Sequence, residues 1–221
     1  MGHDGTAEWL KNIGQAYGVS AEKISDGQNA FLPAIKGAIA GAPITGRITL
    51  SGYEGSELLV ARLLIESCAE ILYGRTACAK SPWSEWDRQW LEARGGTVKF
   101  RASLEDDCMA MGFFEPDLAI GTTPVVQKAK EKAVPELYFT NLISARPLVG
   151  PAGAGSLGQV VNAAIAGKGR MEDMKAFFEG AGTADTAGIR EGSPNLRPDF
   201  RAQHQKKLGK AAKALKVEEM I

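Results

Sequence analysis

The sequence predicts an α/β fold in which a parallel sheet of about five strands carries helices on both faces, with further helices at both ends of the chain. Two observations support this fold class. Short runs of strand-forming residues alternate with helical periodicity between residues 44 and 142, and Gly, Pro or Ser stands at most boundaries. The intervening helical segments, about 8 to 16 residues long, suit the right-handed crossovers that connect parallel strands.

Five segments have the composition of short buried strands. Each is rich in aliphatic, aromatic or β-branched residues, and a turn residue precedes or follows it. In chain order the predicted strands are 47–51 (RITLS), 71–73, 97–101 (TVKFR), 118–120 and 137–139.

The segments between these strands have the spacing of amphipathic helices. Residues 54–69, 84–93 and 123–133 repeat apolar side chains at intervals of three and four. Ser103 is a predicted N-cap for a short helix, and Asp106 completes an imperfect capping box. The sheet and these helices together predict a Rossmann-like domain.

The composition divides the chain into four parts. Residues 1–43 read as two helices, with Pro33 as a possible kink in the second, and 44–142 form the Rossmann-like α/β domain. Residues 143–180 are a glycine-rich loop followed by helices, and 181–221 are a loop and a basic C-terminal helix. That helix presents either a solvated charged face or a surface that docks on a partner subunit.

The first helix is predicted to begin at an N-cap, Thr6, in the turn HDGT. Apolar residues then recur at helical spacing and are expected to face inward. They are Trp9, Leu10, Ile13 and Tyr17.

Composition and motifs exclude several classes of protein. With 26 basic and 26 acidic residues the net charge is zero, which gives no field to attract nucleic acid, and no apolar run approaches the roughly 20 residues that span a bilayer. The N-terminus does not resemble a signal peptide, so a cytoplasmic location is expected. No GxGxxG motif follows the first predicted strand, and no GxxxxGK[ST] motif is present, so this chain is not expected to bind dinucleotide or ATP.

The three cysteines predict no metal site and no disulfide framework. Cys68, Cys78 and Cys108 are far apart in the sequence and form no CxxC pair. His3 and His204 are the only histidines and stand near opposite ends of the chain. This chain alone is therefore expected to provide no metal ligands.

Ligands of parallel sheets lie beyond the carboxyl ends of the strands, so the loops there are candidate sites. Thr122, in the loop 121–124 (GTTP), is a candidate substrate contact. The loop 73–85 combines cationic and aromatic side chains, which suits a planar carboxylated ligand, and its tryptophans fit a role in covering the sheet edge equally well. These side chains are Arg75, Cys78, Lys80, Trp83 and Trp86.

Residues 138–161 (YFTNLISARPLVGPAGAGSLGQVV) are read as a strand that stops at a glycine-rich loop and restarts as a helix. Such a loop leaves backbone N–H groups free near a helix start, where they bind an anion or a carbonyl. A stiff connection without a binding role fits the same pattern.

The amino-acid sequences of four segments resemble those of the Y subunits of chlorophyllide a reductases, which belong to the nitrogenase component 1-like family. These segments are 3–10 (HDGTAEWL), 46–67 (GRITLSGYEGSELLVARLLIES), 121–130 (GTTPVVQKAK) and 138–161. The resemblance covers essentially the whole chain but only the C-terminal half of the family proteins. Cys68 stands where the family commonly has Gly.

The resemblance implies a part of an ATP-dependent enzyme complex that reduces the C7=C8 double bond of chlorin ring B, with two electrons, in bacteriochlorophyll synthesis. The implied partners are the Z subunit, an ATP-hydrolysing iron protein and the substrate chlorophyllide a, in a hetero-oligomer. A [4Fe-4S] cluster is held through other segments, so this chain alone is expected to bind no cofactor and to be inactive.

Site residues follow from the same resemblance. Arg146 is the expected contact to a carboxylate, and the backbone around Gly153, Gly155 and Ser156 is expected to position the substrate. His3 and Asp4 are weaker candidates for a proton donor. Two alternatives remain open, a noncatalytic fragment that keeps subunit contacts and an unrelated small-molecule-binding α/β domain.

Overall fold

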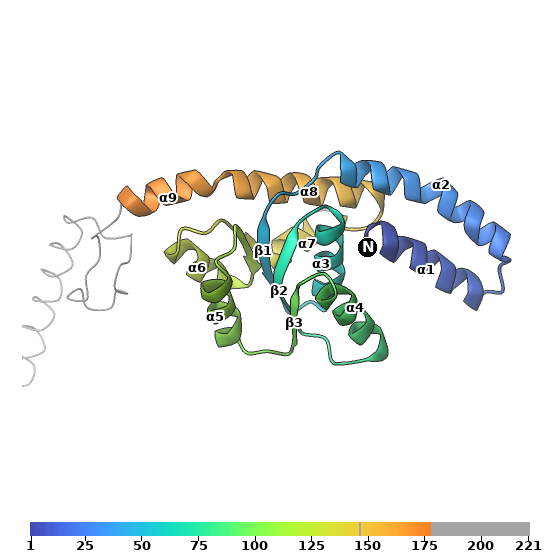
Figure 1. The fold of residues 1–221 in the computed structure, drawn as a ribbon, viewed down its shortest axis with the longest axis horizontal. Helices are drawn as coiled ribbons and strands as arrows, with labels where there is room; N and C mark the ends of the chain where they lie inside the picture. Colours follow the sequence, from blue (N-terminus) through green and yellow to red (C-terminus); the bar gives the residue numbers. More distant parts are fainter. Residues whose placement is uncertain (146, 178–221) are drawn as a thin grey trace, which may run out of the picture. The chain divides into compact units, whose positions relative to one another are not determined.

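A computed structural model describes residues 1–145 and 147–177 of the chain (Figure 1). Its centre is a five-stranded sheet with the strand order β3-β2-β1-β4-β5, and every neighbouring pair is parallel. The predicted fold class is therefore confirmed. The strands are β1 (Arg47–Ser51), β2 (Glu70–Thr76), β3 (Thr97–Phe100), β4 (Leu118–Gly121) and β5 (Glu136–Tyr138).

Helices connect the strands as the periodicity predicts. They are α3 (Glu57–Glu66), α4 (Pro82–Glu92), α5 (Leu104–Phe114), α6 (Thr123–Glu131) and, after β5, the short α7 (Phe139–Ser144). The capping box at α5 is confirmed, because the Asp106 amide donates to Ser103 Oγ at 3.1 Å and the Ser103 amide donates to Asp106 Oδ2 at 2.9 Å.

The two faces of the sheet pack into separate clusters. Leu118 and Ile120 of β4 join the larger cluster, which also contains α3 and helix α8 (Gly150–Ala166). Ala119, between them, points to the smaller cluster with α5 and α6. This alternation along one strand, with burial on both sides, explains why the central strands read as continuous apolar runs.

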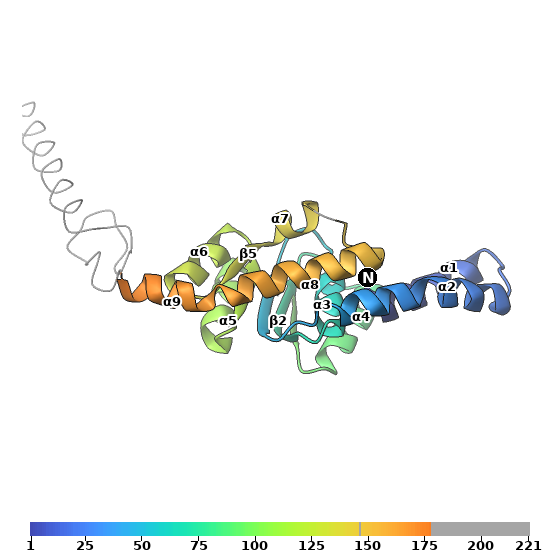
Figure 2. The same ribbon diagram turned by 90° about the horizontal axis from the view of Figure 1, so that it is seen from above.

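Two antiparallel helices, α1 (Gly2–Ala16) and α2 (Ala21–Ala40), precede the sheet. They lie side by side in both views and extend away from the strands (Figures 1 and 2). Gln28 Nε2 donates to the Ala7 carbonyl at 2.8 Å, which joins the two helices. The prediction that residues 1–43 form two helices is confirmed.

Two details of that prediction are wrong. Helix α1 begins at Gly2 and not after Thr6, whose hydroxyl donates to the Gly2 carbonyl at 2.6 Å. Trp9, Ile13 and Tyr17 do not face inward but are 57%, 40% and 83% exposed. The apolar periodicity is real, yet this part of α1 reaches past the sheet and nothing in the described residues covers it.

The predicted glycine-rich loop is also shorter than expected. Residues 150–156 form the first turns of α8, with Pro151 in the first turn, where its missing N–H costs nothing. A Cβ at Gly155 would make ordinary contact with Ala38 at 3.7 Å, whereas a Cβ at Gly158 would meet the Ala42 carbonyl oxygen at 2.5 Å. Gly158 therefore lets α8 approach the end of α2 closely, and Gly153 and Gly155 are helical residues that do not mark a loop.

The chain forms two compact units, residues 1–130 with 134–168 and residues 131–133 with 169–221. The first contains the whole sheet. Of the second, the described part is residues 131–133 and 169–177, mainly helix α9 (Lys168–Phe177). The predicted loop at 181–199, the basic C-terminal helix and His204 lie outside the described residues. Among the helices of residues 1–145 and 147–177, none has the length and hydropathy needed to cross a membrane.

Cys68 adopts a conformation that favours glycine, which explains the family preference expected at this position. It follows α3 with φ of 74°, and its amide donates to the Ile65 carbonyl while the Ala69 amide donates to Leu64, each at 2.9 Å. These two bonds form a Schellman motif, whose left-handed residue is usually Gly.

We expect Cys68→Gly to raise the free energy of unfolding by about 0.5 to 1 kcal/mol. The left-handed conformation costs an L-residue about 1 to 2 kcal/mol, of which the extra backbone entropy of Gly cancels a part. Urea denaturation measures the change. The matched control is Ala93→Gly at the end of α4, where φ is −61° and the same substitution should destabilise. A loss of stability in both variants would contradict the prediction.

Candidate functional site

The carboxyl ends of the strands meet at one edge, where α/β sheets bind their ligands. The chain leaves β1 toward β2 and β3 on one side and later returns to β4 on the other, so the topological switch point lies between β1 and β4. Ser51 ends β1 and Gly121 ends β4, and a Cβ on Gly121 would lie 3.0 Å from Ser51 Oγ. The loops 52–56 and 122–123 flank this point.

Glu57 fixes the loop that follows β1. Its side chain is fully buried, and Oε1 accepts from the amides of Glu54 at 2.7 Å and Gly55 at 3.1 Å. Oε2 accepts from Thr76 Oγ1 at 2.7 Å, so the same carboxylate ties this loop to the end of β2. The Cys78 thiol adds a bond to the Gly55 carbonyl at 3.1 Å.

Arg75 joins two neighbouring loops to helix α5 and is turned into the protein. It donates to the Gly52 carbonyl at 3.1 Å and to the Ala102 carbonyl at 2.8 Å, and it lies 3.6 Å from Asp107 Oδ2. The Tyr53 ring covers its guanidinium carbon at 4.5 Å. Arg75 therefore organises the edge instead of offering a free cation to a ligand.

The rest of residues 73–86, which form the end of β2, a short loop and the start of α4, does not form one ligand surface either. Trp86 packs against the buried Arg62 of α3 at 4.5 Å from the guanidinium carbon, and Lys80 lies 5.8 Å from the Phe100 ring. Trp83 is 77% exposed. These side chains turn to different neighbours, so the structure does not bring the cations and aromatics of this segment together at one surface.

Asp107 and Tyr73 form a buried pair beside Arg75. The Tyr73 hydroxyl donates to Asp107 Oδ1 at 2.9 Å, and both side chains are buried. Burial raises the pKa of the Asp107 carboxyl from 3.8 to about 6, although the hydrogen bond from Tyr73 and the charge of Arg75 oppose this change. Burial likewise raises the pKa of Tyr73.

This pair predicts a pH-dependent stability. Because the Asp107 pKa is higher in the folded state, folding binds a proton between about pH 4 and pH 6, and stability falls as pH rises through that window. The loss is about 2 to 3 kcal/mol at about 1.4 kcal/mol per pKa unit. Asp107→Asn should remove this pH dependence. The difference in unfolding free energy between wild type and variant should therefore change by about 2 to 3 kcal/mol between pH 4 and pH 7.

Urea titrations at both pH values measure this difference. Glu105→Gln, on the exposed side of the same helix, is the control and should leave the pH dependence of wild type in place. An Asp107→Asn variant whose stability keeps the wild-type pH profile would show that Asp107 is ionised without penalty.

Thr122 is the predicted site residue that lies at the switch point. It precedes α6, and its carbonyl accepts from the Val126 amide at 2.9 Å. Its hydroxyl oxygen is buried and has no hydrogen-bond partner in the structure. A buried hydroxyl group without a partner therefore lies at the edge where a ligand of this fold binds.

The remaining site predictions fall elsewhere. Gly153, Gly155 and Ser156 lie in α8, where amides beyond the first turn bond to carbonyls four residues back, so the expected free amides of Gly155 and Ser156 are absent. Ser156 Oγ donates to the Gly153 carbonyl at 3.3 Å. Arg146 lies outside the described residues.

His3 and Asp4 lie in the first turn of α1, where both amides donate to the Glu66 carboxylate, that of Asp4 at 3.2 Å. Glu66 ends α3 and so lies near the start of β2, at the opposite edge of the sheet from Thr122. Burial raises the pKa of Glu66. The structure therefore does not bring His3 and Asp4 together with Thr122.

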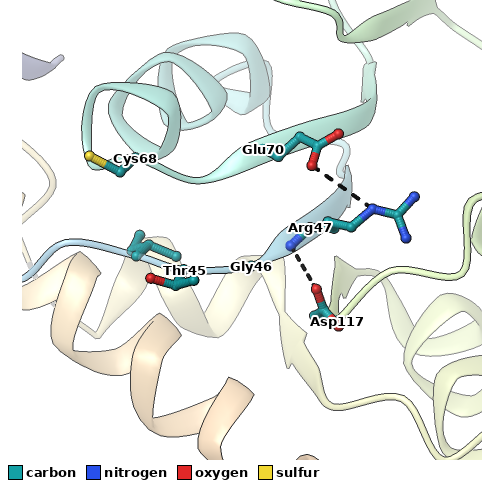
Figure 3. A pocket seen from close by; sticks show the side chains of 7 residues that line it. Thr45, Gly46, Arg47, Cys68, Glu70 and Asp117 are labelled. Carbon is teal, nitrogen blue, oxygen red and sulfur yellow. Dashed lines mark hydrogen bonds and ion pairs between the residues drawn. The ribbon is translucent and has the colours of Figure 1, made fainter.

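A pocket of about 400 Å³ opens at that opposite edge (Figure 3). Its polar groups pair with one another: Arg47 Nε lies 3.9 Å from Glu70, and Asp117 accepts from the Arg47 amide at 3.0 Å and from Lys168 at 2.7 Å. Of the predicted substrate contacts that the structure describes, none lines this pocket. Its lining residues are Ile44, Thr45, Gly46, Arg47, Cys68, Glu70 and Asp117.

The cysteines do not fit an iron–sulfur cluster, which commonly takes four thiolate ligands. Cys68 lines the pocket at one edge, Cys78 follows β2 at the other, and Cys108 lies in α5. Across residues 1–145 and 147–177, no three His, Cys, Asp or Glu side chains are grouped so that they could hold a metal ion.

Sequence reasoning missed Glu57 and Asp107. Both are acidic residues in the first turn of a helix, where a carboxylate is ordinarily exposed and stabilises the helix dipole. Their burial depends on Thr76 and Tyr73, which are 19 and 34 residues away, and no local signal marks those contacts.

Curated relatives match the whole chain. It is 73% identical over 221 residues to the chlorophyllide reductase 52.5 kDa chain of Cereibacter sphaeroides and 70% identical to the protein of the same description from Rhodobacter capsulatus. The chain spans 44% of the length of each relative. The predicted resemblance is thereby confirmed, and the alternative of an unrelated α/β domain is wrong.

Solved structures share the fold. The structure described as nitrogenase Cp1 at pH 6.5 has a TM-score of 0.53 and 18% identity over 86% of this chain and 42% of its own. The structure at pH 5 has a TM-score of 0.56 and 12% identity over 75% and 40%. The family described as nitrogenase component 1 type oxidoreductase matches residues 1–166. The chain therefore belongs to the nitrogenase component 1 type oxidoreductase family.

Proposed function

We propose that this chain is part of the Y subunit of a chlorophyllide a reductase, the enzyme complex that reduces the C7=C8 double bond of chlorin ring B with two electrons and two protons. The observation that carries the proposal is the 73% identity to a chlorophyllide reductase chain over all 221 residues. Family membership supports the oxidoreductase class.

The proposed complex supplies what this chain lacks. A [4Fe-4S] cluster would be held by cysteines of other segments and of the Z subunit, because Cys68, Cys78 and Cys108 lie apart. ATP would be hydrolysed by a separate iron protein, which favours a cytoplasmic hetero-oligomer. The chain by itself would then be inactive.

Within the complex we assign the carboxyl edge of the sheet to the substrate side. Support comes from the switch point between β1 and β4 and from the buried, unpaired hydroxyl of Thr122 beside it. A chlorin is planar and mostly apolar, so burial supplies most of its affinity and a few polar groups orient it. Thr122 would serve as one such group, and Arg146 as a carboxylate contact.

Gly153, Gly155 and Ser156 would act indirectly, by forming the first turns of α8 and so fixing where the preceding loop meets that helix. His3 and Asp4 stay candidates for proton donation only if the complex places a substrate near the start of α1.

A chimera tests the proposal. The matched 44% of the Cereibacter sphaeroides chain is replaced by these 221 residues, and the product is combined with the Z subunit, the iron protein, ATP and dithionite. The spectral change from chlorin to bacteriochlorin should appear at a rate comparable to that of the parent complex. A folded chimera that assembles but leaves chlorophyllide unreduced would support a noncatalytic interaction fragment instead.

A further inference from the structure

The outer part of the α1–α2 hairpin carries a row of exposed apolar side chains. Trp9, Ile13 and Tyr17, here called the hairpin stripe, are 57%, 40% and 83% exposed. Trp9 and Ile13 of α1 and Tyr17, the residue that caps its C-terminal end, are spaced four residues apart, so they lie on one side of the hairpin helix. Tryptophan and tyrosine are the residue types that most often dominate protein interfaces.

The hairpin is anchored at its inner end. There the first turn of α1 is bound by Glu66, and the end of α2 packs on α8 through Ala42 and Gly158. Further out, the contacts join α1 and α2 to each other, as where Gly14 accommodates the Ile24 side chain. Both views show the hairpin extending beyond the strands (Figures 1 and 2).

The outer part of such a hairpin has little stability on its own. Isolated helices of this length are marginal in water, and most helical stability comes from packing an amphipathic face. The outer hairpin packs one side of α1 on α2 and leaves the stripe to solvent. A further surface that covers the stripe would stabilise the hairpin, because the apolar area would leave water.

The size of the stripe decides between two kinds of occupant. Its exposed area is roughly 400 Å², so two copies paired through it would bury about 800 Å², below the 1,000 Å² or more of specific interfaces. A surface joined to the hairpin by the same polypeptide needs less area, because covalent linkage raises its effective concentration. The curated relatives are long enough to provide one, since this chain spans 44% of their length.

We propose that the hairpin stripe is the docking surface for the part of the longer reductase polypeptide that lies outside the matched 44%. This inference rests on the proposed function. The docked surface is apolar at its centre, to accept Trp9 and Tyr17, and polar at its rim.

The experiment compares the 221-residue chain with the full-length chimera described above. Hydrogen exchange of the amides in residues 9–31 and hydroxyl-radical labelling of Trp9 and Tyr17 are measured in both. We expect exchange to be at least about tenfold slower and labelling to fall severalfold in the chimera, because docking stabilises the hairpin. Equal exchange and labelling in the two proteins would overturn the inference.

Substitutions sharpen the comparison. The triple variant Trp9→Glu, Ile13→Glu, Tyr17→Glu should leave the unfolding of the 221-residue chain nearly unchanged but abolish the protection in the chimera. The matched control, Lys11→Glu with Gln15→Glu, places charges on another side of α1, since each residue is two positions from a stripe residue, and should preserve protection. A triple-variant chimera that keeps full protection would contradict the proposal.

Other occupants give different results. If the 221-residue chain forms a dimer by light scattering and the triple variant makes it monomeric, the occupant is a second copy and the proposal fails. Protection that appears only after the Z subunit is added also overturns it. A chimera that protects the stripe but does not reduce chlorophyllide argues against the proposed function alone, and an active chimera with an exposed stripe argues against this inference alone.

Discussion

Replacing Glu57 by Ala should lower the free energy of unfolding by about 3 to 5 kcal/mol. The fully buried carboxylate accepts from two amides and from Thr76 Oγ1, and each buried donor left without a partner costs about 1 to 3 kcal/mol. Proteins of this size are stable by only about 5 to 15 kcal/mol, so the loss is a large fraction of the total. Urea denaturation followed by circular dichroism measures it.

Glu57→Gln is the matched control. Its amide oxygen can accept from the amides of Glu54 and Gly55, and the Thr76 hydroxyl can turn to accept from its NH₂ group. We expect a loss of about 1 kcal/mol, typical of exchanging one hydrogen-bond pattern for another. Equal losses in the two variants would show that the charge of Glu57 matters more than its hydrogen bonds.

Gly158→Ala should destabilise the chain by about 2 to 3 kcal/mol. The added methyl group would lie 2.5 Å from the Ala42 carbonyl oxygen and 2.9 Å from Ala42 Cβ, so α2 and α8 must move apart. Overpacking of this kind costs about 1 to 3 kcal/mol or more, which exceeds the gain of about 1 kcal/mol from replacing Gly in a helix. Thermal and urea unfolding give the change.

Gly155→Ala, one turn earlier in α8, should have the opposite effect and raise the free energy of unfolding. Its methyl group would make ordinary contact with Ala38 at 3.7 Å, so the helical gain of about 0.5 to 1 kcal/mol remains. If residues 150–156 were instead a loop in solution, this substitution would bring no such gain. The pair therefore tests both the helix and the close approach of α2 and α8.

The order of strands and helices was predictable because it depends on neighbours in the sequence. Alternating apolar runs, turn residues and the Ser103–Asp106 capping box are local signals, and the structure contains the corresponding elements. The family could also be recognised, because the amino-acid sequences of 46–67 and 121–130 resemble the family, and this similarity can be seen without a structure.

The tertiary structure decided where side chains go once the elements meet. Glycines 153 and 155 suggested a loop, yet they belong to a helix, because what a glycine permits depends on the neighbour that approaches it. Glu57 became a buried acceptor only because Thr76, on another strand, lies beside it.

The periodicity of α1 determined that Trp9, Ile13 and Tyr17 share a side of the helix, but a period contains no information about what covers that side. Here the helix extends past the sheet, and the three residues face solvent. The sequence by itself determined the elements, their order and the family. Burial, close approach and exposure arose from contacts between distant segments, which only the folded chain brings together.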